Sequence, residues 1–464
     1  MCNVSLNGTQ PTDASIRVLR ALEAAGLEAW YVGGWVRDAL MGRPSHDVDM
    51  CCSGLWQESK EALEAADIAV VESGIKFGGI TAICDDERIE VTTYRLDGFY
   101  TDGRHPQSVE RAASLEDDLA RRDFTVNAMA WHPERGLVDR YDGQGDLDRK
   151  LIRAVGDPKR RFNEDALRML RAVRFACRLD FMIEPKTKQA LAECAPLLDA
   201  VARERVGIEL EGILSTGHGG DAMLRYPELI CAAVPELAAG RGFDQRSVYH
   251  AFNVYEHIAR VLTVAGELAL CDGVAPSSSL MWAAFLHDVS KPECFTVDHD
   301  GSGHFYGHPE LGAKKARVIM DRLALSHDLV RDVCLLIKYH DKPLRPERSC
   351  LLNMMRALSG EGVDTPRLMD ELMDLKRADT LGKAPSCFYY VETIEEMRTL
   401  AHDLLQAGEP YTLKMLAING GDLIRAGVKP GPELGQLLNA ALDAVIEDNI
   451  PNNREALLAH LNLN

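Results

Sequence analysis

The sequence lacks several features that would place a protein in a membrane or outside the cell. It contains no apolar run of about 18 residues or more, so no segment is long enough to span a bilayer as a helix. Residues 1–12 hold neither the basic nor the apolar segment of a signal peptide. The 12 cysteines include no CxxC pair and form neither a zinc ribbon nor a disulfide framework. We therefore expect a reduced, cytoplasmic protein with no membrane contact.

Positive charge is also scarce, because 71 acidic residues outnumber 52 basic ones and give a net charge of −19. This balance argues against a nucleic-acid partner, since contacts with phosphates need Lys and Arg. Residues 149–178 reverse it, with ten basic residues and three acidic ones. A local basic face is enough to bind nucleic acid, although a solvated helix surface would explain the same charges.

Hydrophobic periodicity indicates an α+β fold class. Residues 1–150 mix helical patterns, at 13–25, 35–41 and 56–66, with strand patterns near 29–32, 46–50, 68–72, 79–84 and 88–95. Residues 98–107 are polar and contain glycine, which is typical of a loop. The pattern is then almost entirely helical, and we predict further domains over 151–240, 247–382 and 383–464.

The first chemical pattern is Asp47-Val48-Asp49. On a strand, residues i and i+2 point to the same face, so the two carboxylates repel each other unless a cation lies between them. Mg²⁺ prefers one or two carboxylates together with substrate phosphates. Gly33-Gly34, between a predicted strand and a helix, allows backbone N–H groups to approach a phosphate, and Glu90 supplies a third acid. A surface strand with two solvated acids remains the alternative for the DxD pattern alone.

Three longer motifs carry a resemblance to a known family. Gly33-Gly34-Trp35-Val36-Arg37-Asp38 with Asp47-Val48-Asp49 resembles the signature of the DNA polymerase beta-type nucleotidyltransferases. Residues 121–130, RRDFTVNAMA, and 163–175, NEDALRMLRAVRF, resemble further motifs of the bacterial class II branch, which comprises CCA-adding tRNA nucleotidyltransferases and poly(A) polymerases. The resemblance is dense over residues 25–240. It implies a polymerase-beta-like head (1–150) with a mixed sheet and helices, followed by a helical neck (151–240), an HD-type body (247–382) and a helical, tRNA-binding tail (383–464).

The resemblance also implies roles for individual residues. Asp47, Asp49 and Glu90 are expected to be catalytic, with Asp47 and Asp49 holding Mg²⁺. Asp165 and Arg168, expected together with Glu164 on one helix, would pair with the base of the incoming CTP or ATP. A surface ion pair would explain Asp165 and Arg168 equally simply if they stood alone, and helix packing would explain Arg171 and Arg174. The full expected nucleotide-binding set is Gly33, Gly34, Arg37, Arg122, Asp123, Asn127, Glu164, Asp165, Arg168, Arg171 and Arg174.

A second pattern of metal-type residues lies in the predicted body. Its order, H…HD…H…H…D, resembles the HD-domain phosphohydrolases, although Val289-Ser290 replaces the Ile-Gly that often follows the HD pair. Imidazole and carboxylate groups suit divalent transition metals, so we expect a second metal ion of unspecified identity. A vestigial site used for packing or RNA contact is the alternative. The expected ligands are His257, His287, Asp288, His308, His340 and Asp379.

Taken together, the motifs predict an enzyme that builds or repairs the CCA end of tRNA from CTP and ATP. Residues 96–115 resemble the flexible loop needed to switch from C to A addition, and the glycine-rich turns near 420 and 431 resemble the tail of HD-containing CCA-adding enzymes. These turns are either RNA phosphate contacts or ordinary helix connections. A poly(A) polymerase or A-adding enzyme is the nearest alternative, and an HD phosphohydrolase with a degraded head is the alternative of another class. No pattern indicates an oligomeric state.

Overall fold

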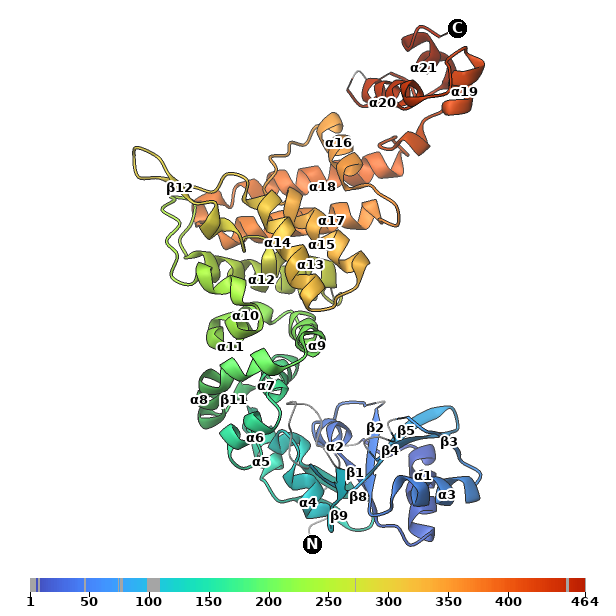
Figure 1. The fold of residues 1–464 in the computed structure, drawn as a ribbon, viewed down its shortest axis with the longest axis vertical. Helices are drawn as coiled ribbons and strands as arrows, with labels where there is room; N and C mark the ends of the chain where they lie inside the picture. The colour runs from blue at the N-terminus through green and yellow to red at the C-terminus, as the bar shows by residue number, and fades with distance from the viewer. Residues whose placement is uncertain are drawn as a thin grey trace. The chain divides into compact units, whose positions relative to one another are not determined.

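A computed structural model describes residues 6, 9–45, 47–73, 75, 78–97, 109–271, 273–447 and 450–463. The chain forms two compact units, which are coloured along the chain in Figure 1. Unit 1 comprises the residues up to Ile213 together with Tyr226–Ala233, and unit 2 comprises Leu214–Arg225 with Val234–Asn464. This division follows compactness alone, so the four domain limits expected from the sequence stay predictions.

A seven-stranded mixed sheet forms the centre of unit 1, with the strand order β3-β4-β5-β2-β1-β8-β9. Strand β2 pairs parallel to β5, whereas its other neighbour, β1, is antiparallel. The β2–β5 register places Asp49 directly beside Glu90. The strands are β1 (Ala29–Val32), β2 (Val48–Cys52), β3 (Ala69–Val71), β4 (Gly79–Cys84), β5 (Glu87–Thr93), β8 (Met129–His132) and β9 (Gly136–Asp139).

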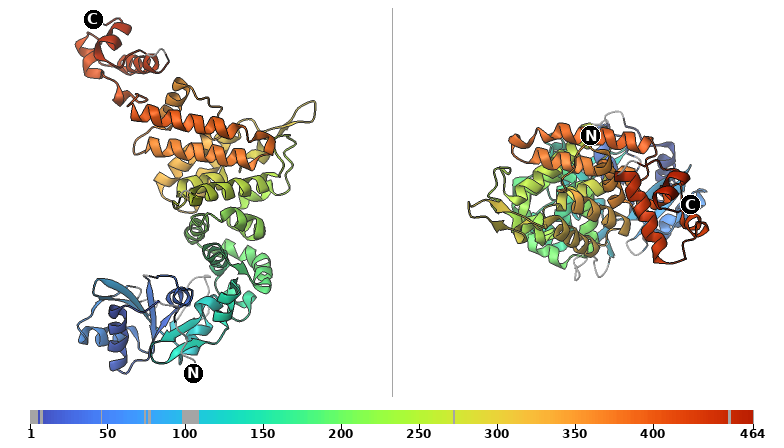
Figure 2. Two further views of the ribbon diagram at one scale, coloured as in Figure 1. Left: turned by 180° about the vertical axis from the view of Figure 1, so that it is seen from behind. Right: turned by 90° about the horizontal axis from the view of Figure 1, so that it is seen from above.

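Helices cover both faces of this sheet. Figures 1 and 2 show α1 (Asp13–Ala24) and α3 (Trp56–Ala65) on one side and α2 (Gly34–Leu40) on the other. Helix α1 buries Val18 and Leu22 from its apolar stripe. Thr12 caps its first turn, because the Thr12 hydroxyl accepts a hydrogen bond from the backbone N–H of Ser15. The predicted helices and strands of this region are confirmed to within a few residues.

The predicted C-to-A switching loop has a paired base. Its flanks form a two-stranded ribbon, β6 (Arg95–Asp97) with β7 (Val109–Arg111). Residues 98–108, the centre of that segment, lie outside the described residues, and its switching role stays a prediction.

The remaining elements of unit 1 are mainly helical, as predicted for the part of the chain after about residue 150. They include α4 (Leu115–Ala120), η2 (Thr125–Asn127), α5 (Gly143–Asp148), β10 (Leu151–Ile152), α6 (Pro158–Glu164), α7 (Leu167–Leu179), β11 (Met182–Ile183), α8 (Pro185–Cys194), η3 (Ala195–Ala200), α9 (Arg203–Leu214) and α11 (Pro227–Ala233).

One local prediction for unit 1 was wrong. Glu164, Asp165 and Arg168 do not share one helix, because α6 ends at Glu164 and α7 starts at Leu167. Asp165 is extended, with φ −145° and ψ 107°, and its Oδ1 accepts a hydrogen bond from the Leu167 N–H at 3.0 Å. An Asp side chain competes with the helix for backbone donors in this way and favours a break followed by a new helix start.

Unit 2 is built around a helical bundle. Helix α12 packs against α10, α13 and α17, and α14 packs against α15. Trp282 and Phe285, both almost fully buried, fill part of its core. Among the described residues, no helix is both long and apolar enough to span a bilayer. The elements of this bundle are α10 (Gly219–Arg225), η4 (Pro235–Gly240), α12 (Val254–Cys271), α13 (Ser278–Leu286), η5 (Lys291–Glu293), β12 (Thr296–Val297), β13 (Gly303–His304), α14 (His308–Arg322), α15 (His327–Tyr339), α16 (Arg348–Leu358), α17 (Thr365–Gly382), η6 (Pro385–Cys387) and α18 (Tyr390–Gln406).

The C-terminal helices belong to the same unit. They are η7 (Leu413–Met415), α19 (Gly420–Arg425), α20 (Pro432–Glu447) and α21 (Arg454–His460). Asn419 caps α19, since its Oδ1 accepts from the N–H groups of Gly421 and Asp422. The backbone N–H of Asn419 in turn donates to Asp422 Oδ2. The chain itself therefore uses these donors, which favours the helix-connection interpretation of this turn over an RNA phosphate contact.

Candidate functional sites

Three predicted acids meet at one edge of the unit 1 sheet. Asp49 on β2 and Glu90 on β5 lie side by side in the parallel register. Asp47 immediately precedes β2, one residue outside the strand that was expected to include it. All three line a cavity of about 470 Å³. The arrangement can bind a divalent cation, because the repulsion between adjacent carboxylates falls when a cation is shared between them.

The surroundings of Asp49 shift the pKa of its carboxyl group. Burial, together with the charge of Glu90, raises the pKa of Asp49 from 3.8 to about 6, although Arg122 opposes the shift. A carboxyl group with this pKa is a proton-sensitive metal ligand.

The glycine turn stands at the same cavity. Gly33 has φ +69°, and a Cβ there would lie 3.1 Å from Arg122 Nη1 and 3.5 Å from Asp49 Oδ2. Glycine is required for both the backbone conformation and the close approach. The first turn of α2 therefore opens beside the acids, in the position that a phosphate-binding helix N-terminus requires.

A hydrogen-bonded chain links the other predicted nucleotide residues of unit 1. Arg37, only 4% exposed, donates from Nη1 to Asn127 Oδ1 at 2.7 Å. Asn127 Nδ2 donates to Asp123 Oδ1 at 3.3 Å, and Arg171 Nη2 donates to Asp123 Oδ2 at 2.7 Å. Burial alone would raise the pKa of Asp123, but the charges of Arg171 and Arg168 and the hydrogen bonds from Arg171 and Asn127 together lower it. Arg37, Asp123, Asn127 and Arg171 all line the cavity.

Helix α7 gives the cavity a row of cations. Arg168, Arg171, Arg174 and Arg178 line it at helical spacing, and Phe175 stacks under the guanidinium groups of Arg171 and Arg174 at 5.4 and 4.8 Å. Only this second half of the basic segment faces the site. Earlier members pair with acids elsewhere, such as Arg153 with Asp146.

Glu164 and Asp165 do not line the cavity. Glu164 Oε2 accepts from Arg168 Nη1 at 3.0 Å, and Asp165 Oδ2 accepts from Arg205 Nη2 at 3.4 Å. Of the predicted base-selecting residues, Arg168 alone therefore reaches the cavity wall in this conformation.

Asp118 is a residue of this site that the motifs did not reveal. Its carboxylate, 0% exposed, accepts from Arg121 Nη2 at 2.6 Å and from Arg122 Nη2 at 3.0 Å. Its Oδ1 also accepts from the backbone N–H of Arg95 at 3.4 Å, at the base of the β6–β7 ribbon. Burial alone would raise the pKa of Asp118, but the two guanidinium groups hold it below the usual value. The only signal in the sequence was the spacing of Asp118 to Arg121 and Arg122 on one helix turn.

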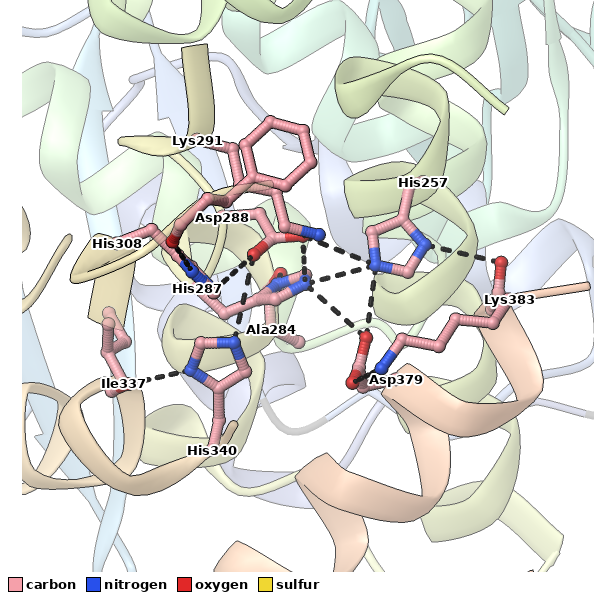
Figure 3. Close-up of polar contacts among 12 residues, drawn as sticks. His257, Ala284, His287, Asp288, Lys291, His308, Ile337, His340, Asp379 and Lys383 are labelled. Atoms are coloured by element: carbon pink, nitrogen blue, oxygen red, sulfur yellow. Dashed lines mark hydrogen bonds and ion pairs between the residues drawn. The ribbon is translucent and has the colours of Figure 1, made fainter. Parts of the chain in front are cut away.

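The second predicted set converges in unit 2, as Figure 3 shows. His257 Nε2 lies 3.3 Å from Asp288 Oδ2 and 3.0 Å from Asp379 Oδ1. His287 Nε2 lies 3.2 Å from Asp288 Oδ2. On the other carboxylate oxygen, Asp288 Oδ1, His308 Nε2 lies at 3.4 Å and His340 Nε2 at 3.7 Å. The six residues come from five helices or helix ends, because His287 and Asp288 both follow α13, and all six are buried.

Backbone carbonyl groups orient the four imidazoles. The Nδ1 atoms of His257, His287, His308 and His340 lie 2.7–3.2 Å from the carbonyl oxygens of Gly382, Ala284, Phe305 and Ile337. An N–H donated there turns each Nε2 toward the carboxylate of Asp288, which is the orientation that metal-binding histidines use.

The donor set fits a metal ion. Both carboxylate oxygens of Asp288 and the His308 Nε2 are buried without a hydrogen-bond partner. Two groups of three ligands share Asp288: one adds His257 and His287, and the other adds His308 and His340. A buried carboxylate costs free energy unless cations compensate it, and Asp288 Oδ1 faces the Nε2 atoms of His308 and His340, where a metal ion would supply that charge.

Two lysines at this site were not predicted. Lys291 Nζ lies 2.7 Å from Asp288 Oδ2, and Lys383 Nζ lies 2.6 Å from Asp379 Oδ2. Each follows its aspartate by three or four residues, a spacing that brings side chains together on a helix. The charge of Asp379 raises the pKa of Lys383 against the opposing effect of burial.

Models of four protein families match the chain. The Poly A polymerase head domain matches residues 29–153, the HD domain residues 254–383, the "Probable RNA and SrmB- binding site of polymerase A" residues 180–239, and tRNA nucleotidyltransferase domain 2 residues 383–461.

Whole-length relatives decide the identity. A CCA-adding enzyme of Streptococcus mutans is 32% identical over 447 residues, which is 96% of this chain and 95% of the relative. One from Lactobacillus delbrueckii is 31% identical over 99% of this chain and 100% of the relative. The chain belongs to the CCA-adding enzyme family.

Solved structures agree with this family. The crystal structure of the Bacillus stearothermophilus CCA-adding enzyme in complex with CTP matches 98% of this chain and 97% of its own, with a TM-score of 0.71 and 26% identity. A Thermotoga maritima CCA-adding enzyme shares the fold with a TM-score of 0.62 and 21% identity, over 100% of this chain and 98% of its own. The α+β fold class and the nucleotidyltransferase activity are confirmed, and both the head and HD domains imply the use of divalent metal.

Replacing Asp118 with Asn tests its contact with the two arginines. The loss of one buried charge leaves Arg121 and Arg122 without their carboxylate, so the free energy of unfolding should fall by about 3–5 kcal/mol and CTP should bind more weakly. Denaturant unfolding and nucleotide titration measure the two effects. The control is Glu116→Gln on the same helix. Its ion pair with Arg140 is exposed, so its loss should change the free energy of unfolding and CTP binding only slightly. Equal behaviour of the two variants would contradict this role for Asp118.

The raised pKa of Asp49 predicts a pH-dependent metal affinity at the head. Below about pH 6 a proton occupies Asp49 and competes with the cation, so the apparent Mn²⁺ affinity should fall about tenfold per pH unit. Above pH 6 the affinity should be nearly constant. Mn²⁺ titrations of the wild type and of Asp49→Asn are compared between pH 5 and pH 8. Other metal sites contribute equally to both proteins, so the difference between them reports the affinity of the head site. A wild-type profile that is flat through pH 6 would contradict the assignment.

Proposed function

We propose that the unit 1 cavity adds C and A residues to the 3′ end of tRNA with release of pyrophosphate. The observation that supports this most directly is the pairing of Asp49 with Glu90 on parallel strands, beside Asp47 and opposite the arginines of α7. The relatives of this chain are CCA-adding enzymes, which fits the same reaction.

In this reaction the 3′-hydroxyl oxygen of the RNA bonds to the α-phosphorus of CTP or ATP, and the bond from that phosphorus to the bridging oxygen breaks. The hydroxyl loses its proton, and pyrophosphate leaves. Mg²⁺ held by Asp47, Asp49 and Glu90 would lower the pKa of the hydroxyl and neutralise the phosphates.

The arginines have different roles in this proposal. Arg37 is buried and hydrogen-bonded to Asp38 and Asn127, so it holds the site together rather than moving onto a substrate. Arg171 and Arg178 are more exposed on the cavity wall and provide cations for the triphosphate or the RNA backbone. The N-terminal turn of α2 after Gly33-Gly34 adds backbone donors.

Base selection is assigned to Arg168 with Asp165 and Glu164. Arg168 is 8% exposed and faces the cavity, where its guanidinium can donate to the Watson–Crick edge of C or A. Its present acceptors include Glu164 and the Arg121 carbonyl, so a base would replace one of them. Asp165 reaches the base only if its contact with Arg205 opens.

Two further segments of the chain are assigned to tRNA binding. Residues 151–240 and 383–464 are proposed as the neck and the tRNA-binding tail. Their matches to an RNA-binding-site model and to a tRNA nucleotidyltransferase domain support this division.

Incubation with tRNA that lacks its last three nucleotides tests the main proposal. With CTP, ATP and Mg²⁺, the wild type should add C, C and A and then stop. Asp49→Asn should lower the rate by several orders of magnitude, because it removes one negative metal ligand. Asp86→Asn is the matched control, since Asp86 lies in the exposed β4–β5 turn. Long A tails, or A addition only to tRNA that already ends in CC, would reject the proposal.

A second function is supported by the HD cluster. We propose that His257, His287, Asp288, His308, His340 and Asp379 bind a divalent metal that hydrolyses a phosphoester. The convergence of the imidazole Nε2 atoms on Asp288, beside a cavity of about 300 Å³ that His308, His340 and Asp379 line, favours this over a packing role. Water adds to phosphorus, the ester P–O bond breaks, and the leaving oxygen takes a proton. The metal would activate the water, and Lys291 and Lys383 would offset the charge of the phosphate.

Metal content and hydrolysis of 4-nitrophenyl phosphate test the second function. The wild type should retain Mn²⁺ or Ni²⁺ and release nitrophenol, whereas His287→Gln should lose both properties. His299→Gln, at an exposed histidine, is the control. Asp49→Asn should hydrolyse normally, because its site is built from residues of unit 1. Absence of both metal and hydrolysis in the wild type would reject the second function.

A further inference from the structure

The ring of Phe175 is a meeting point for three guanidinium groups in unit 1. The guanidinium carbons of Arg37, Arg171 and Arg174 lie 5.4, 5.4 and 4.8 Å from its centroid. Cation–π contacts form within about 6 Å of a ring centroid, and proteins have roughly one of them per 70–80 residues. Phe175 is 7% exposed and lines the cavity that holds the acids. Three such contacts on one ring at this cavity call for a reason beyond packing.

The three arginines reach this ring from two helices. Arg171 precedes Phe175 by one turn of α7, and Arg174 is its neighbour in the sequence. Arg37 comes from α2, the helix that follows the glycine turn. Phe175 therefore joins the helix that opens beside the acids to the helix that carries the row of cations.

Each of the three guanidinium groups also has a carboxylate partner. The pairs are Arg37 with Asp38 at 2.8 Å, Arg171 with Asp123 at 2.7 Å, and Arg174 with Glu209 at 2.6 Å. A guanidinium group can donate to a carboxylate and lie over an aromatic ring at the same time. Each of the three is therefore held from two sides, by its own carboxylate and by the shared ring.

Burial divides these arginines into one anchor and two residues of the cavity wall. Arg37 is 4% exposed and also donates to Asn127, whereas the side chains of Arg171 and Arg174 are 35% and 20% exposed. Three positive charges around one ring repel one another. The π faces of the ring carry partial negative charge, which reduces this repulsion before a substrate arrives. Phe175 can therefore keep the two cavity arginines in place in the empty site.

We propose that Phe175 positions Arg171 and Arg174 for the triphosphate of the incoming nucleotide, by holding both against the buried Arg37. Phe175 acts through the guanidinium groups and is a positioning residue. Weaker π faces should lower the affinity for CTP and leave the chemical step nearly unchanged, because the acids of β2 and β5 are not part of this cluster. The proposal deepens the nucleotidyl transfer proposed for the unit 1 cavity and rests on it for the identity of the substrate.

Replacing Phe175 in the full-length chain with mono-, di- and trifluorophenylalanine tests the proposal. Fluorine withdraws electrons from the π faces and changes the size of the ring little, so the series weakens the cation–π contacts in steps. The KM for CTP in CCA addition should rise with each fluorine and reach about tenfold with three, the size of one or two such contacts. The inhibition constant of inorganic tripolyphosphate should rise by the same factor, because the ring acts on the phosphate contacts. The kcat should stay near that of the wild type.

The matched control places trifluorophenylalanine at Phe181, which is 4% exposed and does not line the cavity. Its KM for CTP should equal that of the wild type. Phe175→Leu should raise the KM at least as much as three fluorines. It also removes the edge-on contact of Phe175 with Phe124, whose ring centroid lies 5.9 Å away. The fluorinated series therefore decides between a role of the π faces and a role of packing, because it keeps the ring.

Two results would overturn the role of Phe175. One is a KM for CTP that is the same in the wild type and the trifluoro variant. The other is a fall in kcat at unchanged KM, since that pattern indicates a general disturbance of the site.

Direct titration with CTP separates this inference from the proposed transfer reaction. CTP binding that weakens with each fluorine, in a chain that adds no nucleotide to tRNA, would reject the transfer and keep the role of Phe175. Normal CCA addition, with a CTP affinity that does not respond to fluorine, would reject the role of Phe175 and keep the transfer.

Discussion

Both sites depend on the compensation of carboxylate charge that the fold holds close together or out of water. Asp49 and Glu90 are fixed side by side by the parallel pairing of β2 with β5, and the register leaves them no freedom to separate. The fold meets this cost with cations from elsewhere, namely Arg122 from the α4–η2 connection and the arginines of α7. Burial, together with the charge of Glu90, still raises the pKa of Asp49 in the presence of these cations. A divalent metal and a triphosphate would complete the charge balance, so the same geometry suits both.

The HD cluster solves the same problem in a different way. Asp288 is fully buried among four imidazoles, and the backbone carbonyls behind the rings fix which nitrogen faces it. Lys291 and Lys383 add positive charge beside the carboxylates of Asp288 and Asp379. The head places its acids on the wall of a cavity, whereas the HD cluster surrounds a fully buried acid with residues from five helices or helix ends. The two sites can therefore differ in metal and in accessible chemistry within one chain.

Much of this arrangement was visible in the sequence, for physical reasons. Strands and helices such as Ala29–Val32 and Trp56–Ala65 follow local hydrophobic periodicity, which does not require knowledge of distant partners. The break at Asp165 was missed because its cause is a side chain that caps the next helix, and the surrounding composition is helical throughout. Asp118 was missed because an aspartate at a helix start is common, and its burial under two arginines is a tertiary property.

The sequence by itself determined the chemical inventory: the spacing of Asp47 and Asp49, the glycine turn before them, and the order of the HD residues, since these depend on local geometry and on residue type. Only the tertiary structure decided which charged groups lie in contact with one another. It placed Glu90 against Asp49 through strand register, joined Asp118 to Arg121 and Arg122, and brought Lys291 and Lys383 to the aspartates of the HD cluster. Electrostatic and stacking interactions act over a few ångströms in space, and the separation of residues along the chain does not reveal which of them meet.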